Sequence, residues 1–342
     1  MADRLLELVY AHPELADLDP EARRAAIESL VRAEVGDDVA PQETARLVRT
    51  IDGFGPLTEL LEDDEVTDVL VNGHRDVWVE RNGRLQRTDL CLDHDELDVL
   101  LQRLVARGGS RFDPLHPMTD VALANGDRLH VVGPPIAPDG PVVSIRRFPK
   151  DALTLHDLVT AGTISPRQEV DLAELVRTRA SIAISGATGV GKTTLLGALL
   201  SAVADDERVV VIEETRELRP RLAHAIHLTT RSSNIEGSGA VTSSDLVRTA
   251  LRMRPDRLVV GEVRGPEAAD ALWAISTGHA GSMLTVHARG PEHVPLVLAG
   301  LAAGASPMAA PELAVRFTDA IDAFVHLQRV GSRRVVTALV VR

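Results

Sequence analysis

The chain has 342 residues, of which 44% are hydrophobic and 25% charged, and this composition is typical of a soluble globular protein with two domains. The formal net charge of −13 argues against a chain-wide nucleic-acid surface, because phosphate binding requires clustered cations. The only cysteine, Cys91, excludes an intrachain disulfide and a four-cysteine zinc site. We expect a cytoplasmic protein without membrane insertion, because no apolar signal core and no unbroken apolar span stands in the sequence.

Residues 1–52 are expected to form a helical N-terminal segment. Ala22–Val35 carries apolar residues at helical spacing, and Ala45–Ile51 is a second, shorter stretch of the same kind.

Residues 53–149 are expected to form a small mixed α/β domain that contains two hairpins. Alternating polar and apolar residues over Asp76–Glu80, followed by Asn82–Gly83, predict the first hairpin and its tight turn. The second hairpin spans Asp120–Val132, with Asn125–Gly126 at its tip. The other elements predicted here are the helix Asp95–Arg107 and the strand Val142–Phe148.

Residues 150–166 are predicted to be a linker, in which Leu153–Val159 is a candidate short helix, and residues 167–342 a domain in which strands and helices alternate. Such alternation predicts a mainly parallel sheet with helices covering its faces. The predicted strands are Ser181–Ser185, Arg208–Glu213, Arg257–Val260 and Met283–His287, and then Ala323–Gln328 and Arg334–Val341, which are joined around Gly331–Ser332.

The segment Gly186–Thr193 fits the phosphate-loop pattern G-x-x-x-x-G-K-[ST] without exception. It follows a predicted strand and opens a predicted helix, Lys192–Ala204, which is the context that the motif requires. Glycines let successive N–H groups point at a phosphate, and the helix N-terminus adds partial positive charge. We therefore expect ATP to bind here. The residues predicted to contact it are Gly186, Ala187, Thr188, Gly189, Val190, Gly191, Lys192, Thr193 and Thr194.

Two residues of this loop have specific expected roles. Lys192 is expected to place its ammonium between the β- and γ-phosphates, and Thr193 to give its hydroxyl to Mg²⁺. Of the 37 basic residues only Lys150 and Lys192 are lysines, which favours a role for Lys192 that arginine cannot fill.

Acidic residues follow two of the predicted strands. Val209–Ile212 runs into Glu213 and Glu214, and the strand that starts at Arg257 runs into Glu262. Ligands of parallel sheets bind outside the carboxyl ends of the strands, and ATP hydrolysis needs a carboxylate that orients or deprotonates water. The pattern favours Glu262 and Glu213 as site residues, and it leaves Glu214 undecided between the site and a solvated loop.

Two histidines, His279 and His287, are eight positions apart and form no metal signature in a chain with one cysteine. Each is expected either to face phosphate or to be packed in a satisfied polar network.

Several separated segments resemble the type II/type IV secretion ATPase superfamily. Arg252–Gly265 resembles its Walker B segment, Ser276–Ser282 and Thr285–Ala288 its histidine box, and Ile212–Thr215 its aspartate box. The resemblance runs from about Gly53 to the C-terminus. The segments that resemble the tight-adherence (Flp-type) pilus assembly branch most closely are Gly53–Leu57, Val71–Gly73, Ser144–Phe148 and Asn234–Gly237.

This resemblance implies a homohexameric ring in which a PAS-like N-terminal domain precedes a RecA-like P-loop ATPase domain. It assigns Glu262 to activating water, Glu213 to magnesium through its water shell, and His287 to sensing the γ-phosphate. It also implies that Arg128 and Arg146, with Arg147 as an alternative, reach the nucleotide phosphates from the N-terminal domain. Glu214 stands where the family usually has aspartate, and Ala280 where it often has an acidic residue.

The resulting hypothesis is an Mg²⁺-dependent ATPase that powers pilus assembly or protein secretion across the bacterial envelope. Its expected partners are inner-membrane platform proteins, through which it would lie at the inner face of the cytoplasmic membrane. One alternative is a nucleotide-binding regulatory or scaffold subunit with little turnover. The other is a nucleic-acid translocase, against which the acidic charge and the aromatic content of 2% both argue.

Overall fold

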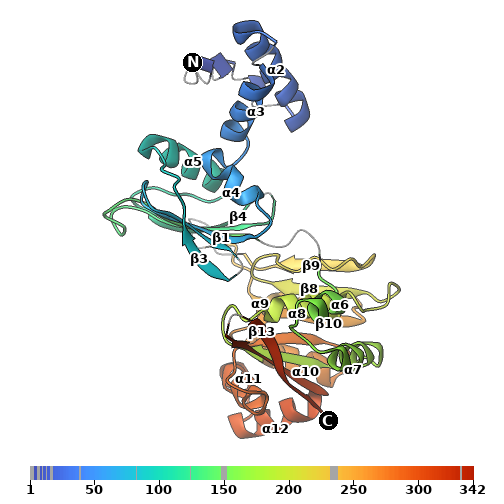
Figure 1. The fold of residues 1–342 in the computed structure, drawn as a ribbon. Coiled ribbons are helices and arrows are strands. Elements are labelled where there is room, and N and C mark those ends of the chain that lie inside the picture. The colour runs from blue at the N-terminus through green and yellow to red at the C-terminus, as the bar shows by residue number, and fades with distance from the viewer. Residues whose placement is uncertain are drawn as a thin grey trace. The chain divides into compact units, whose positions relative to one another are not determined.

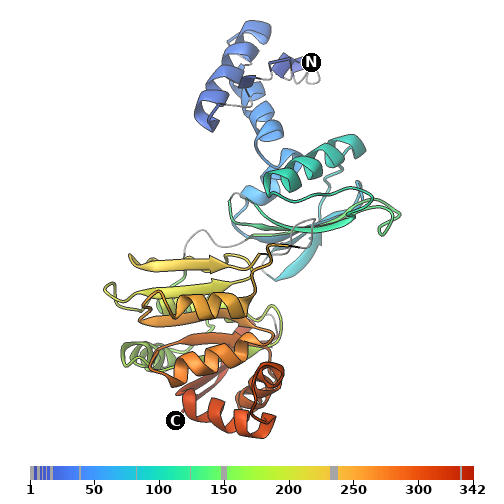
Figure 2. The ribbon, with the colours of Figure 1, turned by 180° about the vertical axis from the view of Figure 1, so that it is seen from behind.

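The computed structural model describes residues 4–5, 8–9, 11–12, 14–15, 18–37, 40–81, 83–123, 125–147, 152–231, 238–331 and 333–342. The chain divides into two compact units, Met1–Phe148 and Pro149–Arg342, whose elements are labelled in Figure 1 and seen from behind in Figure 2. Within the described part of the chain, no helix combines the length and the apolarity needed to cross a bilayer.

The N-terminal unit starts with a small helical core. Helices α2 (Pro20–Val35) and α3 (Ala40–Ile51) bury Ile27, Val31 and Leu47 against each other. The Asp19 carboxylate caps α2 by accepting from the Glu21 and Ala22 N–H groups. Both helices confirm the helical pattern of the sequence, and α3 begins five residues earlier than Ala45.

The rest of this unit is an antiparallel sheet with helix α5 (His94–Arg107) packed on it through a row of leucines. The strand order among the described residues is β3-β2-β1-β6-β5-β4. The strands are β1 (Val66–Asn72), β2 (Val77–Arg81), β3 (Arg84–Arg87), β4 (Met118–Ala122), β5 (Arg128–Val132) and β6 (Val142–Arg146), and the short helices η2 (Gly55–Leu57) and α4 (Thr58–Glu62) precede them.

Both predicted hairpins are present. Arg81 pairs with Arg84 across the first turn, whose Asn82 lies outside the described residues, and Ala122 pairs with Arg128 across the second. Strand β1 was not predicted, although it joins β2 to β6 at the centre of the sheet. Its register shifts between Val66 and Asp68, which breaks the alternation that marks a strand in the sequence.

The C-terminal unit has the strand order β13-β12-β7-β11-β10-β8-β9 in its described part, and only β13 runs antiparallel to its neighbour. This mainly parallel sheet confirms the predicted α/β fold class. The strands are β7 (Ile182–Gly186), β8 (Val209–Glu213), β9 (Ala225–Thr229), β10 (Arg257–Val263), β11 (Met283–Val286), β12 (Ala323–Val330) and β13 (Arg333–Val341). Strand β9 was not predicted, because its side chains are only half buried.

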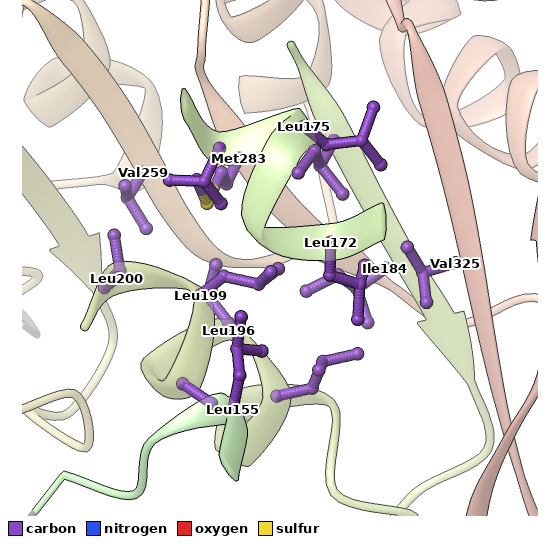
Figure 3. Close-up of a cluster of buried hydrophobic side chains, with 14 of the residues drawn as sticks. Leu155, Leu172, Leu175, Ile184, Leu196, Leu199, Leu200, Val259, Met283 and Val325 are labelled. Atoms are coloured by element: carbon purple, nitrogen blue, oxygen red, sulfur yellow. The ribbon is translucent and has the colours of Figure 1, made fainter. Parts of the chain in front are cut away.

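Helices cover both faces of this sheet, and alternate residues of one strand face opposite covers. On β7, Ile182 and Ile184 pack with the first helical group, whereas Ala183 packs with the second. Figure 3 shows leucines of the first group, including Leu172 and Leu196, pointing toward the strand residues. The first group is α6 (Leu155–Thr160), α7 (Pro166–Arg177) and α8 (Lys192–Leu200), and the second is α9 (Ser243–Ala250), α10 (Glu267–Ser276), α11 (Val294–Ala302) and α12 (Ala310–Ala320), with the turns η3 (Pro291–His293) and η4 (Ala303–Ala305).

The segment predicted to be a linker contributes to this core. Thr154 caps α6 through a capping box with Asp157, and Leu155, Leu158 and Ile164 are buried in the C-terminal unit. Residues 148–151 lie outside the described part of the chain.

Candidate nucleotide-binding site

The phosphate loop connects the end of β7 to the start of α8, as the motif predicts. Gly189 and Gly191 have φ of 72° and 93°, a conformation that side chains rarely adopt. Gly186 has φ of 150°, and a Cβ there would lie 2.5 Å from the Leu327 carbonyl oxygen of β12. Glycine is therefore required at these positions for the loop to curl beside its neighbouring strand.

Lys192 is held against the backbone of this loop. Its Nζ donates to the carbonyl oxygens of Gly186 at 3.2 Å and Ala187 at 3.0 Å. Burial lowers the pKa of Lys192, and the nearby Glu262 carboxylate opposes that shift. The loop thus holds a partly desolvated cation at two of its carbonyl oxygens, where a phosphate would add negative charge.

Glu262, at the end of β10, is connected to Lys192 through His287. The Lys192 Nζ lies 3.3 Å from His287 Nδ1, and His287 Nε2 contacts the Glu262 carboxylate. Since the ammonium can only donate, Nδ1 accepts from it, and Nε2 carries the proton of the imidazole. Residues from α8, β10 and the end of β11 therefore form one polar chain.

The charge of Glu262 depends on its neighbours. Burial raises the pKa of this carboxyl, but the hydrogen bond and the positive charge of Arg264, together with His287 and Lys192, outweigh burial, so the pKa lies below its usual range. Glu262 is thus a carboxylate that remains ionised although it is largely covered.

Glu213 and Glu214, at the end of β8, have different surroundings. Glu213 is buried, and its Oε1 accepts from the N–H groups of Glu217 and Leu218 at 3.0 and 2.9 Å. Its Oε2 has no hydrogen-bond partner among the described residues and lies 3.7 Å from His227 Nδ1. Glu214 is exposed and accepts from Arg264 Nη1 at 2.9 Å.

These acids fit a magnesium ion bound through water. No group of three or more histidine, cysteine or acidic side chains within the described residues could enclose a metal. Magnesium usually keeps several waters and takes few protein oxygens, so the unpaired Glu213 Oε2 is a suitable acceptor for such a water.

A pocket of about 1080 Å³ adjoins the first half of the phosphate loop. His326 and Gln328 of β12 also line this pocket. His326 is buried, and its Nδ1 lies 2.8 Å from the Ser185 hydroxyl, one residue before the loop. Sequence analysis missed His326, although a histidine inside the apolar run Ala323–Leu327 is a usable signal of a polar contact.

His279 and His287 have different surroundings. His279 Nδ1 lies 3.1 Å from the Ala274 carbonyl oxygen near the end of α10, which is a satisfied structural contact. His287 alone belongs to the charged chain with Lys192 and Glu262.

The two candidate arginines of the N-terminal unit are neighbours on its sheet. Arg128 of β5 and Arg146 of β6 are register partners, and they form ion pairs at 3.1 Å with Asp120 and Asp68. Arg147 instead donates to backbone carbonyls, including that of Val66 at 2.8 Å. The structure therefore brings Arg128 and Arg146 together within their own unit. The segment Asn234–Gly237, quoted above for the branch resemblance, lies outside the described residues.

A glycine loop that joins a central parallel strand to a helix, with acids at the ends of neighbouring strands, defines a P-loop nucleotide-binding protein of the RecA-like class. The chain belongs to the type II/IV secretion system protein family, whose model matches residues 50–329.

Two relatives that match over most of their length support this assignment. A protein of Mycobacterium tuberculosis named for conjugal transfer is 41% identical over 308 residues, which cover 87% of each chain. The conjugal transfer protein TrbB of Rhizobium radiobacter is 31% identical over 301 residues, covering 86% of this chain and 90% of TrbB. The X-ray structure of the Legionella pneumophila ATPase DotB has a TM-score of 0.59 at 21% identity, covering 86% of this chain and 79% of DotB, and it supports the fold alone.

Proposed function

We propose that this chain binds Mg-ATP at Gly186–Thr194 and hydrolyses it as the motor subunit of a secretion or pilus-assembly machine. The observation that carries the proposal is the polar chain from Lys192 through His287 to Glu262, because it links the phosphate loop to an ionised carboxylate. Membership of the secretion family supports the same function.

In this proposal each residue has a distinct task. The loop N–H groups and Lys192 neutralise the β- and γ-phosphates, and Glu262 orients the attacking water and accepts its proton. His287, whose Nε2 faces Glu262, responds to the γ-phosphate. Magnesium, held by the Thr193 hydroxyl and through water by Glu213 and Glu214, would supply further neutralisation of the phosphate charge.

The proposal extends to an assembly. We infer a homohexamer in which Arg128 and Arg146 approach the phosphates, because a guanidinium fork neutralises charge that develops on the γ-phosphoryl group. Platform proteins of the inner membrane would receive the motion and hold the ring at the membrane. The proposed domains are 1–52, 53–149 (PAS-like) and 167–342, and the proposed linker 150–166 packs on the last of these through Leu155, Leu158 and Ile164. The relatives' names refer to conjugal transfer, and the tight-adherence branch stays a prediction.

The test is steady-state ATP hydrolysis by the purified chain with Mg²⁺, compared with Glu262→Gln. Removing a general base lowers kcat by roughly 10²–10⁴-fold, whereas nucleotide affinity should persist. Glu174→Gln on the exposed surface of α7 is the matched control and should leave kcat unchanged. Retained turnover in Glu262→Gln would refute the assignment of the base.

The same preparation distinguishes the alternatives. Tight nucleotide binding with negligible turnover in every oligomeric state would favour a regulatory subunit. A salt-sensitive DNA affinity in the micromolar range would favour a translocase.

A further inference from the structure

Arg264 joins two carboxylates that end neighbouring strands. It lies directly after β10, and its Nη2 donates to Glu262 at 2.7 Å while its Nη1 donates to Glu214 at 2.9 Å. The planar guanidinium presents these donors in a fixed fork, so one side chain fixes the positions of both acids.

The sheet register explains why a bridge is needed here. Ile212 of β8 pairs with Val260 of β10, so Glu214 and Glu262 each lie two residues beyond this pair. Like charges side by side at the ends of adjacent strands destabilise one another. A cation that donates to both removes this repulsion.

The backbone around Arg264 is itself anchored. The N–H groups of Arg264 and Gly265 donate to Glu267 Oε1 at 2.7 and 2.8 Å, and Glu267 is a buried residue at the start of α10. The Arg264 side chain is half exposed, but its fixed backbone and its two hydrogen bonds restrict the rotamers that it samples. The bridge is therefore a built feature of the strand–helix connection.

We propose that Arg264 is a positioning residue, which holds Glu262 oriented and ionised and couples it to Glu214, so that the two carboxylates act as one unit. This inference rests on the proposed role of Glu262 as the base. Arg264 lies outside the phosphate loop, next to the acids Glu262 and Glu214 at the strand ends, and the proposal gives it a positioning role there.

The electrostatic surroundings indicate how the coupling would be seen. Glu262 faces Arg264, His287 and Lys192, and Arg264 faces Glu262, Glu214 and Glu217. Burial raises the pKa of Glu262, and Arg264 is the strongest of the groups that oppose burial. The hydrogen bond that Arg264 donates to Glu262 raises the pKa of Arg264 in return. Without Arg264, only His287 and Lys192 would oppose the rise in the pKa of Glu262 that burial causes.

The first experiment is the pH dependence of ATP hydrolysis. In Arg264→Gln the acidic limb of the kcat profile should move to higher pH by about one unit or more, since an opposite charge at this distance shifts a carboxyl by that amount. The Arg264→Gln variant should have a lower kcat and a nearly unchanged KM. On the acidic limb, its kcat should be about tenfold lower than that of the parent chain. Arg264→Lys keeps the charge but loses the fork, so it should restore only part of the shift. Arg248→Gln, which removes an exposed ion pair with Asp270, should leave the profile unchanged.

The second experiment needs no turnover. With ¹³C-labelled glutamate, the Glu262 carboxyl resonance is the one that Glu262→Gln removes, and its titration gives the pKa directly. We expect a higher pKa of Glu262 in Arg264→Gln than in the parent chain, and we expect Glu214→Gln to change the Glu262 titration more in the Arg264→Gln chain, where the repulsion between the two carboxylates is no longer removed. Identical Glu262 titrations in the parent, Arg264→Gln and Arg264→Lys chains would overturn the inference. A chain that fails to hydrolyse ATP would refute the proposed function, while this titration would still decide the role of Arg264.

Discussion

The two sheets of this molecule hold their charged side chains in opposite environments. In the N-terminal sheet, buried residues alternate with half-buried or exposed ones along β5 and β6, and Arg128 is half-buried whereas Arg146 is exposed. In the C-terminal sheet, every residue of β7 and β8 is buried, and the site's Lys192 and Glu213 are buried as well. An antiparallel sheet can leave one face to water, whereas a parallel sheet with helices on both sides cannot.

This difference decides what each charge can do. Water screens the arginines of the N-terminal sheet, so their ion pairs stabilise the fold little and they remain available for other ligands. In the C-terminal unit each charge depends on a particular partner, and pKa values move as a result, as they do for Glu262 and Lys192. Substitutions should therefore cost far more stability in the second sheet than in the first.

The largest loss of stability is expected for Arg257→Ala. Arg257 is only 1% exposed and donates to both Glu207 oxygens, at 2.7 and 2.8 Å, and to the Val176 carbonyl. Its removal leaves a covered carboxylate without its main partner, which costs about 3–5 kcal/mol. Denaturant unfolding monitored on the C-terminal unit measures the loss. The comparison would fail if Arg257→Ala were no more destabilising than Arg177→Ala, which breaks an exposed pair with Glu174.

The next effect separates two glycines of the phosphate loop. A Cβ on Gly186 would lie 2.5 Å from the Leu327 carbonyl oxygen and 2.8 Å from Val190 Cγ2, whereas a Cβ on Gly189 would meet nothing within 4 Å. Gly189→Ala carries only the cost of positive φ, about 1–2 kcal/mol, and Gly186→Ala adds overpacking of about 1–3 kcal/mol. Thermal unfolding compares the two variants, and equal stabilities would show that the close approach of β12 does not constrain the loop.

The smallest stability effect is expected for Arg128→Gln in the N-terminal sheet. Its ion pair with Asp120 is open to solvent, so unfolding free energy should change by about 0–1 kcal/mol. If Arg128 reaches a nucleotide as proposed, turnover should fall by roughly 10³-fold in the same variant. A loss above about 2 kcal/mol would mean that the charges of the two sheets are not as different as the burial pattern indicates.

The sequence predicted the elements that have a strong local pattern. The phosphate loop, the helix Asp95–Arg107 and the buried strands of the parallel sheet all carry a period or a motif that can be recognised within a few residues. Strands β1 and β9 escaped prediction, because a register shift in one and partial burial in the other remove that pattern.

The candidate site was predictable in its residue types but not in its contacts. Lys192, His287 and Glu262 were named from motifs, and the structure joins them. Arg264 and His326 were not predicted as site residues, because strand register brings each of them to its partners. The pairing of Ile212 with Val260 brings the ends of β8 and β10 together near Arg264, and His326 pairs directly with Ser185. Sequence spacing alone does not contain that register.

The most direct test of the central claim is calorimetry with Mg-ATP on the parent chain and on Lys192→Ala. The central claim is that Gly186–Thr194 binds a triphosphate and that Lys192, held at the carbonyl oxygens of the loop, supplies the cation. It predicts about one nucleotide bound per chain, and an affinity at least tenfold lower in Lys192→Ala, corresponding to about 1.4 kcal/mol or more. Absence of binding in the parent chain, or equal affinity in the two chains, would contradict it.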